Sequence, residues 1–167
     1  LLDRADPALV GKGALVAYAR IVGPALVEAD RQAAALPRVV QDCWDRRLAG
    51  DGIDPVASLL RALQGDVDTL SDLLLRDLGD GYPIARYLAG ERLVHGVGGR
   101  SPAIGAFADA LRRTAMGVDE RSVAIAGAAI DGFAATAELV GKLGPDWAVL
   151  VDHDLQVLRP IVGALMT

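Results

Sequence analysis

The chain has few of the residues that enzymes most often use as nucleophiles, bases or metal ligands. Its 167 residues include one cysteine, two histidines, four serines and four threonines. The single cysteine, Cys43, excludes an internal disulfide and a zinc site built on several cysteines. The HExxH motif of many zinc enzymes and the GxSxG motif of serine hydrolases are both missing. The sequence therefore favours a non-catalytic protein without excluding an enzyme.

Lysine and asparagine are also scarce. There is no asparagine, and only two of the 17 basic residues are lysines. Because codons for these two residues are AT-rich, we infer a GC-rich bacterial genome. The net charge is −5, so the chain lacks the basic excess that holds a phosphate backbone. We therefore predict no nucleic-acid partner.

No apolar run has the length of a membrane-spanning helix, which needs about 20 residues. The most apolar stretch, residues 122–137, is interrupted by Asp131. No signal peptide is visible in the first residues of the sequence. We predict a cytoplasmic protein with no transmembrane segment. Because the chain begins at Leu1 rather than at methionine, we expect it to be a module of a longer protein.

Aromatic residues make up only 4% of the chain, although 52% of it is apolar. The core must therefore be built from Ala, Leu, Val and Ile, of which Ala and Leu favour helices. Four prolines stand where helices would begin, because the first helical turn does not need the missing N–H. Their dipeptides are Asp6-Pro7, Asp54-Pro55, Ser101-Pro102 and Gly144-Pro145.

Apolar residues recur at helical spacing between proline and glycine signals along the whole chain. The predicted helices cover residues 7–35, 37–48, 55–63, 66–78, 83–95, 102–115, 119–143 and 146–166. Pro24 should kink or split the first of them. Ala124, Ala128 and Gly132 lie four residues apart and would form a bare face for close helix packing.

These elements predict an all-α fold in a single domain over residues 1–167. We expect about eight helices arranged as an orthogonal bundle. The proline spacing leaves one alternative, a short α-solenoid of stacked helical hairpins.

The glycine-rich loop 96–101 is the best local candidate for a binding site. Its backbone N–H groups and the following helix N-terminus would attract an anion. The candidate ligand-binding residues in this loop are Gly98, Gly99, Arg100 and Ser101. A flexible connector between two helices explains the same glycines.

His95 precedes this loop and is the candidate catalytic residue. The stretch is similar to a short motif of the histidine phosphotransfer family, helical bundles that carry a phosphoryl group on one histidine. The matching residues are His95, Gly99, Ile104, Gly105 and Ala106. Gly98 replaces that family's lysine, and Pro102 falls where its helix continues. An enzyme or phosphoryl carrier is therefore one alternative function.

Carboxylates supply the remaining candidates. Asp131 lies inside the most apolar predicted helix, where a buried acid would bind a cationic ligand and a solvent-facing one would not. Asp66, Asp68 and Asp72 share a short stretch, but helix capping and a solvated face explain them, and we predict no metal site. Haem ligation by His95 or His153 is the remaining cofactor alternative.

The mean hydropathy is +0.32, which is high for a soluble monomer of this size. We therefore expect an interaction or small-ligand-sensing module that binds a protein partner or a second copy of itself. A small anionic ligand is the expected alternative partner.

Overall fold

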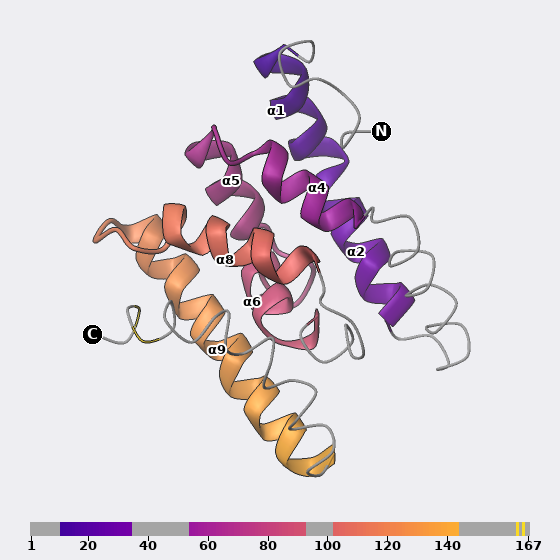
Figure 1. The fold of residues 1–167 in the computed structure, drawn as a ribbon, viewed down its shortest axis with the longest axis vertical. Helices are drawn as coiled ribbons and strands as arrows, with labels where there is room; N and C mark the ends of the chain where they lie inside the picture. Colours follow the sequence, from indigo (N-terminus) through magenta and orange to yellow (C-terminus); the bar gives the residue numbers. More distant parts are fainter. Residues whose placement is uncertain (1–10, 35–53, 93–101, 144–162, 164, 166–167) are drawn as a thin grey trace.

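The computed structural model describes residues 11–34, 54–92, 102–143, 163 and 165 (Figure 1). This part of the chain forms seven helices and no strand, which confirms the all-α prediction. The helices are α1 (Lys12–Ile21), α2 (Gly23–Ala34), α4 (Pro55–Ala62), α5 (Val67–Leu74), α6 (Ile84–Ala89), α8 (Pro102–Thr114) and α9 (Glu120–Leu143). The predicted helix over 37–48 and nearly all of that over 146–166 lie outside the described residues.

Helices α4 and α8 begin at Pro55 and Pro102, as the sequence predicts. Asp54 caps α4, because its carboxylate accepts hydrogen bonds from the backbone N–H groups of Val56 and Ala57 at 2.9 and 3.0 Å. Each bond satisfies an N–H that has no partner within the first helical turn.

The predicted helix over 7–35 is divided into α1 and α2 at Val22. Pro24 occupies the second position of α2. A proline within a helix removes one backbone hydrogen bond and clashes with the preceding turn, which explains the division.

The predicted end of the helix over 66–78 is wrong. Helix α5 ends at Leu74 rather than at Leu78, because Asp77 binds the turn that follows instead of continuing the helix. Its carboxylate accepts hydrogen bonds from the N–H groups of Gly79, Gly81 and Tyr82 at 2.8, 3.3 and 2.8 Å.

Helix α6 ends at Ala89, because Gly90 leaves the helical conformation and interrupts the helix predicted over 83–95. Glu91 and Arg92 are helical again, and the predicted end at His95 lies outside the described residues. Gly90 also lies against α9. A Cβ atom at this position would lie 2.9 Å from the carbonyl oxygen of Arg86 and 3.2 Å from that of Gly132. The backbone of the α6 end and that of α9 are therefore too close for a side chain.

Gly132 carries the close contact on the α9 side. A Cβ atom there would lie 2.5 Å from the carbonyl oxygen of Arg86 and 2.8 Å from the Cβ of Ala89. Thr136, one turn later, donates a hydrogen bond to the carbonyl oxygen of Ala89 at 3.3 Å. The predicted bare face is thus used at Gly132, whereas Ala124 is exposed.

The helices pack as a bundle in which elements far apart in sequence meet. The most extensive contacts join α6 with α9 and α4 with α8. A solenoid would instead stack each hairpin on its sequence neighbours. Figure 1 shows α9 along one side and α1 and α2 along the other, with the shorter helices between them.

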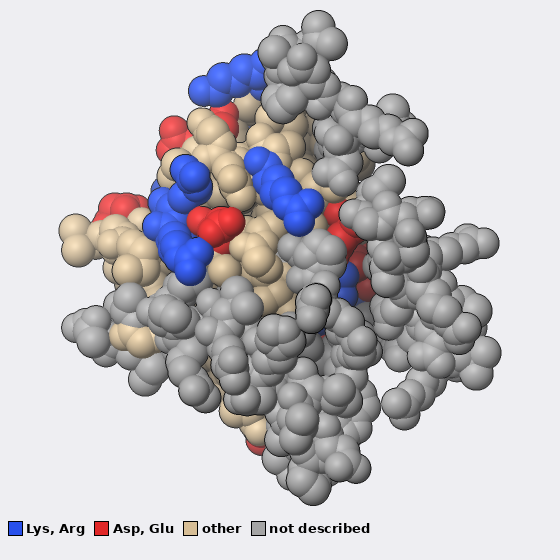
Figure 2. All heavy atoms as spheres, viewed as in Figure 1, with Lys and Arg blue, Asp and Glu red and all other residues tan. Residues whose placement is uncertain are grey.

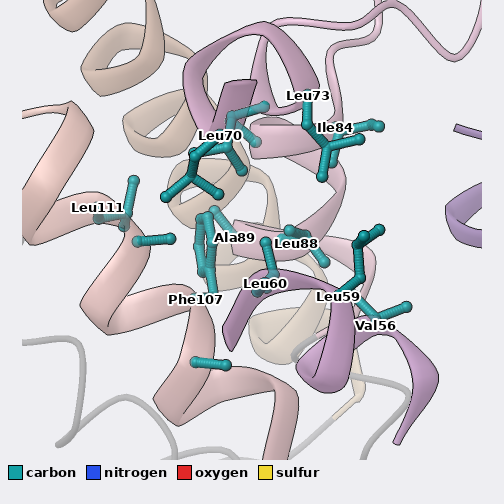
Figure 3. Close-up of a cluster of buried hydrophobic side chains, with 14 of the residues drawn as sticks. Val56, Leu59, Leu60, Leu70, Leu73, Ile84, Leu88, Ala89, Phe107 and Leu111 are labelled. Carbon is teal, nitrogen blue, oxygen red and sulfur yellow. The ribbon is translucent and has the colours of Figure 1, made fainter. Parts of the chain in front are cut away.

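Aliphatic side chains from α4, α5, α6 and α8 form the core (Figure 3). Leu59, Leu70 and Ile84 are completely buried, and Phe107 is the one buried phenylalanine among the described residues. Ile104, Phe107 and Leu111 are all buried on α8. The core therefore lies between α9 on one side and α1 with α2 on the other. It fixes the position of α5, on which the candidate site is built.

Candidate functional site

An open groove of about 670 Å³ lies where α1 and α2 meet α5. This volume falls within the range of known small-molecule sites, roughly 300–1,000 Å³. The groove is lined by Ala19, Arg20, Pro24, Thr69, Asp72, Leu73, Leu75, Arg76 and Asp77. Three segments of the chain contribute to it: the end of α1, the start of α2, and α5 with the turn that follows.

The apolar lining comes from the contact between the α1–α2 junction and α5. Ala19 and Leu73 are buried, and Pro24 and Leu75 are half-buried. Gly23, at the start of α2, lets the α1–α2 junction approach α5 closely, because a Cβ atom there would lie 3.0 Å from Cδ1 of Leu73. The junction that Pro24 imposes on the helix therefore also shapes the groove.

Charged residues form a network at one side of the groove. Arg20 lies 3.7 Å from Asp72, which also accepts a hydrogen bond from Arg121 of α9. Arg121 in turn lies 3.6 Å from Asp68. In the view of Figure 2, basic and acidic side chains also lie close together on the face presented there. Exposed pairs of this kind add little stability, so they mainly set the charge pattern around the groove.

Asp77 closes the turn at the end of the groove. Its carboxylate accepts three backbone N–H groups, and the hydrogen bond from Gly79 is the main cause that lowers the pKa of Asp77 below its usual value. Gly79, Asp80 and Gly81 all have positive φ angles, of 122°, 56° and 72°. The negative charge of Asp77 is therefore bound by the turn.

Arg76 is the exception among the charged lining residues. Its side chain is exposed, and its guanidinium forms no ion pair or side-chain hydrogen bond with any residue that the structure describes. Its charge acts on Asp77 only from beyond ion-pair distance, as the smallest of the causes that lower the pKa of that carboxyl. Arg76 thus places at the groove a positive charge that has no ion-pair partner within the described part of the chain.

A separate cluster of ionised side chains is buried between α2, α4 and α6. Arg92 is only 6% exposed and Asp54 only 2%. The Arg92 guanidinium lies 2.9 Å from Asp30 and 3.1 Å from Asp54. Tyr87 donates a hydrogen bond to the same Asp30 oxygen at 2.7 Å, and burial raises the pKa of Tyr87. Because this cluster is closed to solvent and its charges are paired, we assign it a structural role.

Tyr82 lies between two arginines outside that cluster. The guanidinium carbons of Arg31 and Arg86 are each 4.9 Å from the centre of its ring, within reach of a cation–π interaction. Burial, followed by a hydrogen bond to Glu91, raises the pKa of Tyr82 to about 12. Glu91 also accepts a hydrogen bond from Arg31 at 3.4 Å, so Glu91 links Arg31 to Tyr82.

Of the candidate site residues from the sequence, Asp131 alone is among the described residues, and it is not one of the residues that line the groove. His95, Gly98, Gly99, Arg100 and Ser101 lie outside the described residues, so the anion-binding loop stays a prediction. Asp131 is exposed on α9, and its carboxylate therefore meets solvent rather than a buried cavity.

The acidic stretch of α5 behaves as a cap and a solvated face. Asp66 accepts a hydrogen bond from the N–H of Thr69 at 3.2 Å, and this bond is the main cause that lowers the pKa of Asp66. Asp68 and Asp72 pair with Arg121. Within the described ranges, no group of three or more His, Cys, Asp or Glu side chains has a geometry that holds a metal ion.

Sequence reasoning did not single out Arg20, Arg76 or the Arg92 cluster. Arg76 carried one usable signal, because it follows three consecutive leucines at the end of an apolar helix. Nothing in the sequence shows that the α1–α2 junction lies against this point. The partners of Arg92 are 38 and 62 residues away, and no motif links them.

In the described part of the chain, no helix combines the length and the apolar character needed to cross a membrane. Comparison of the chain with protein-family models, with curated proteins and with solved structures gives no match.

Proposed function

We propose that this protein is a non-catalytic module that binds a small ligand in the groove between the α1–α2 junction and α5. The observation that carries the proposal is the groove itself, in which apolar residues lie among charged ones and the Arg76 guanidinium has no ion-pair partner among the described residues. Ligand sites typically combine a mainly apolar surface with a few polar groups that orient the ligand.

The chemistry of the lining supports binding rather than catalysis. The described residues that line the groove include no histidine or cysteine, and the one hydroxyl group among them belongs to Thr69, whose side chain bonds to Asp66. Asp77 is bound by backbone N–H groups and Asp72 by two arginines. The pKa of Asp77 is lowered, whereas a carboxyl that acts as general acid or base near neutral pH needs a raised one.

A thermal-shift screen of small acids, bases and neutral compounds tests this proposal. We expect at least one class to raise the melting temperature of the wild-type protein. The Leu75→Trp variant should lose this response, because a larger side chain at Leu75 fills the groove. The matched control is Leu78→Trp, since Leu78 is also half-buried but does not line the groove. Equal responses from both variants would contradict the proposal.

The second candidate function is self-association through the corner between α8 and α9. Three apolar side chains are exposed there: Met116, Val118 and Val123. Val118 is 98% exposed. A second copy of the chain would cover these side chains at a two-fold interface, in which the same surface patch is used twice.

Light scattering of the wild-type protein and of the Val118→Asp variant tests this second candidate. We expect the wild type to have twice the mass of the chain and the variant to have the mass of one chain. Because the Val118 side chain is solvent-exposed, the fold of the variant should be unchanged. A wild-type monomer at high protein concentration would rule out self-association.

A further inference from the structure

We propose that the ligand of the groove is an amphiphile with one anionic head group and an apolar tail, and that Arg76 binds the head group. This inference rests on the proposed function and adds the chemical class of the ligand. Three features of the groove support it. The Arg76 guanidinium has no ion-pair partner among the described residues, the carboxylates of Asp72 and Asp77 already accept hydrogen bonds from the protein, and apolar residues line the same groove.

The first step concerns the cations around the groove. Arg20 and Arg121 share one carboxylate, that of Asp72, and Arg121 also lies near Asp68. Both guanidiniums are therefore already engaged by the protein. Arg76 has no such partner among the described residues, so its N–H donors are available to an anion. A guanidinium binds a carboxylate or a phosphate through paired hydrogen bonds.

The second step concerns the anions. A cationic ligand would need a free carboxylate in the groove. Asp72 is held by arginines, and Asp77 directs its oxygens to the N–H groups of the following turn. A cation at either carboxylate would have to break these bonds. The groove therefore selects against a cationic head group.

The third step concerns the tail. Ala19, Pro24, Leu73 and Leu75 come from three segments and line one groove with Arg76. Leu75 and Arg76 are neighbours in the chain, and both line the groove. Ala19 and Leu73 are already buried, so Pro24 and Leu75 supply the apolar surface that an alkyl chain would cover and a small inorganic anion would leave in water. The combination fits a ligand that is charged at one end only.

Isothermal titration calorimetry with octanoate as the probe tests the inference. Octanol has the same tail without the charge, and acetate has the charge without the tail. We expect octanoate to bind more tightly than either by at least about tenfold, because it alone combines the charged hydrogen bonds with the buried tail. Octyl phosphate tests the other source of the anionic group, and tighter binding than octanoate would assign a phosphate head group.

The variants locate the contact. Arg76→Ala should weaken octanoate binding by about tenfold or more, to the level of octanol, because the charged hydrogen bonds are lost. Arg113→Ala is the matched control, because Arg113 is also exposed but does not line the groove. Circular dichroism of both variants should be unchanged, since neither side chain is part of the core.

The failures of the two proposals are distinguishable. If octanol and octanoate bind equally and Leu75→Trp removes both, the groove binds ligands but the anionic class is wrong. If Arg76→Ala behaves like Arg113→Ala, the assignment of Arg76 is wrong. If no compound of the screen shows a response that Leu75→Trp removes, the proposed function fails together with this inference.

Discussion

At the scale of single residues, Arg92 has the largest expected effect on stability. It is the cation in a buried cluster with two carboxylates, Asp30 and Asp54. In Arg92→Met both carboxylates would stay buried without their cation, which costs about 3–5 kcal/mol when a buried pair is broken. Urea denaturation measures this loss, with Arg113→Met as the exposed control. A change of the free energy of unfolding equal to that of the control would contradict the structural role of Arg92.

Tyr87 belongs to the same cluster but has a smaller expected effect. Tyr87→Phe removes one hydrogen bond to Asp30, while Arg92 still pairs with that carboxylate. A hydrogen bond to a charged group contributes about 2 kcal/mol. We therefore expect urea denaturation to rank Tyr87→Phe between Arg113→Met and Arg92→Met, and the opposite order would show that Arg92 is not the centre of the cluster.

Two glycines of α9 provide a matched pair. Gly132→Ala would place a Cβ atom 2.5 Å from a backbone oxygen of α6, so the helices must separate. Overpacking of this kind typically costs about 1–3 kcal/mol. A Cβ atom at Gly127 would meet no other atom within 4 Å, so Gly127→Ala should raise stability by up to about 1 kcal/mol through better helix propensity. Thermal denaturation should shift in opposite directions, and a stabilised Gly132→Ala would disprove the close contact.

At the scale of elements, the turn after α5 makes the free energy of unfolding depend on pH in the acidic range. Backbone hydrogen bonds lower the pKa of Asp77 in the folded state below the ordinary value of 3.8. The folded state therefore binds fewer protons than the unfolded state in this range. The stabilisation from Asp77 is complete above about pH 5, and it is lost as the pH falls through the unfolded and then the folded pKa.

The same direction holds for Asp66 and Asp119, whose pKa values are also lowered, chiefly by the N–H of Thr69 and by the hydroxyl of Ser122. We expect the free energy of unfolding of the wild type to fall between about pH 5 and about pH 3. Asp77→Asn should fall less steeply over this range. Urea denaturation at several pH values measures both slopes, and identical slopes would contradict the role of Asp77 in the turn.

Helix starts were predictable from the sequence because they depend on local chemistry. Asp54-Pro55 and Ser101-Pro102 mark α4 and α8, and Asp66 caps α5. Helix ends were harder, because Asp77 ends α5 through a turn and Gly90 ends α6 through its contact with α9. The end of α5 depends on hydrogen bonds that Asp77 accepts from later residues. The end of α6 depends on contacts with α9, a helix about 40 residues further along the chain.

At the scale of the whole molecule, the groove could not be predicted because it needs three segments to meet. Pro24 was expected to divide a helix, and it does, but the sequence does not show which helix would lie against the division. The contact of Gly23 with Leu73 supplies that information. The site predictions followed local motifs and favoured the loop 96–101, whereas the described groove arises from packing.

The arrangement of charges also belongs to this scale. Arg20, Asp72 and Arg121 come from α1, α5 and α9, and their pairing leaves Arg76 as the available cation of the groove. The proposed selectivity of the groove therefore depends on how three helices place their charges, and not on a local motif.

A two-dimensional amide NMR titration of the labelled protein with octanoate tests the groove most directly as an amphiphile site. We predict that the amide signals of Arg20, Leu75, Arg76 and Asp77 shift together and saturate at one affinity. Amides of the exposed α8–α9 corner, such as Val118, should stay unchanged. Shifts confined to residues outside the groove, or no shifts at any octanoate concentration below micelle formation, would contradict this assignment.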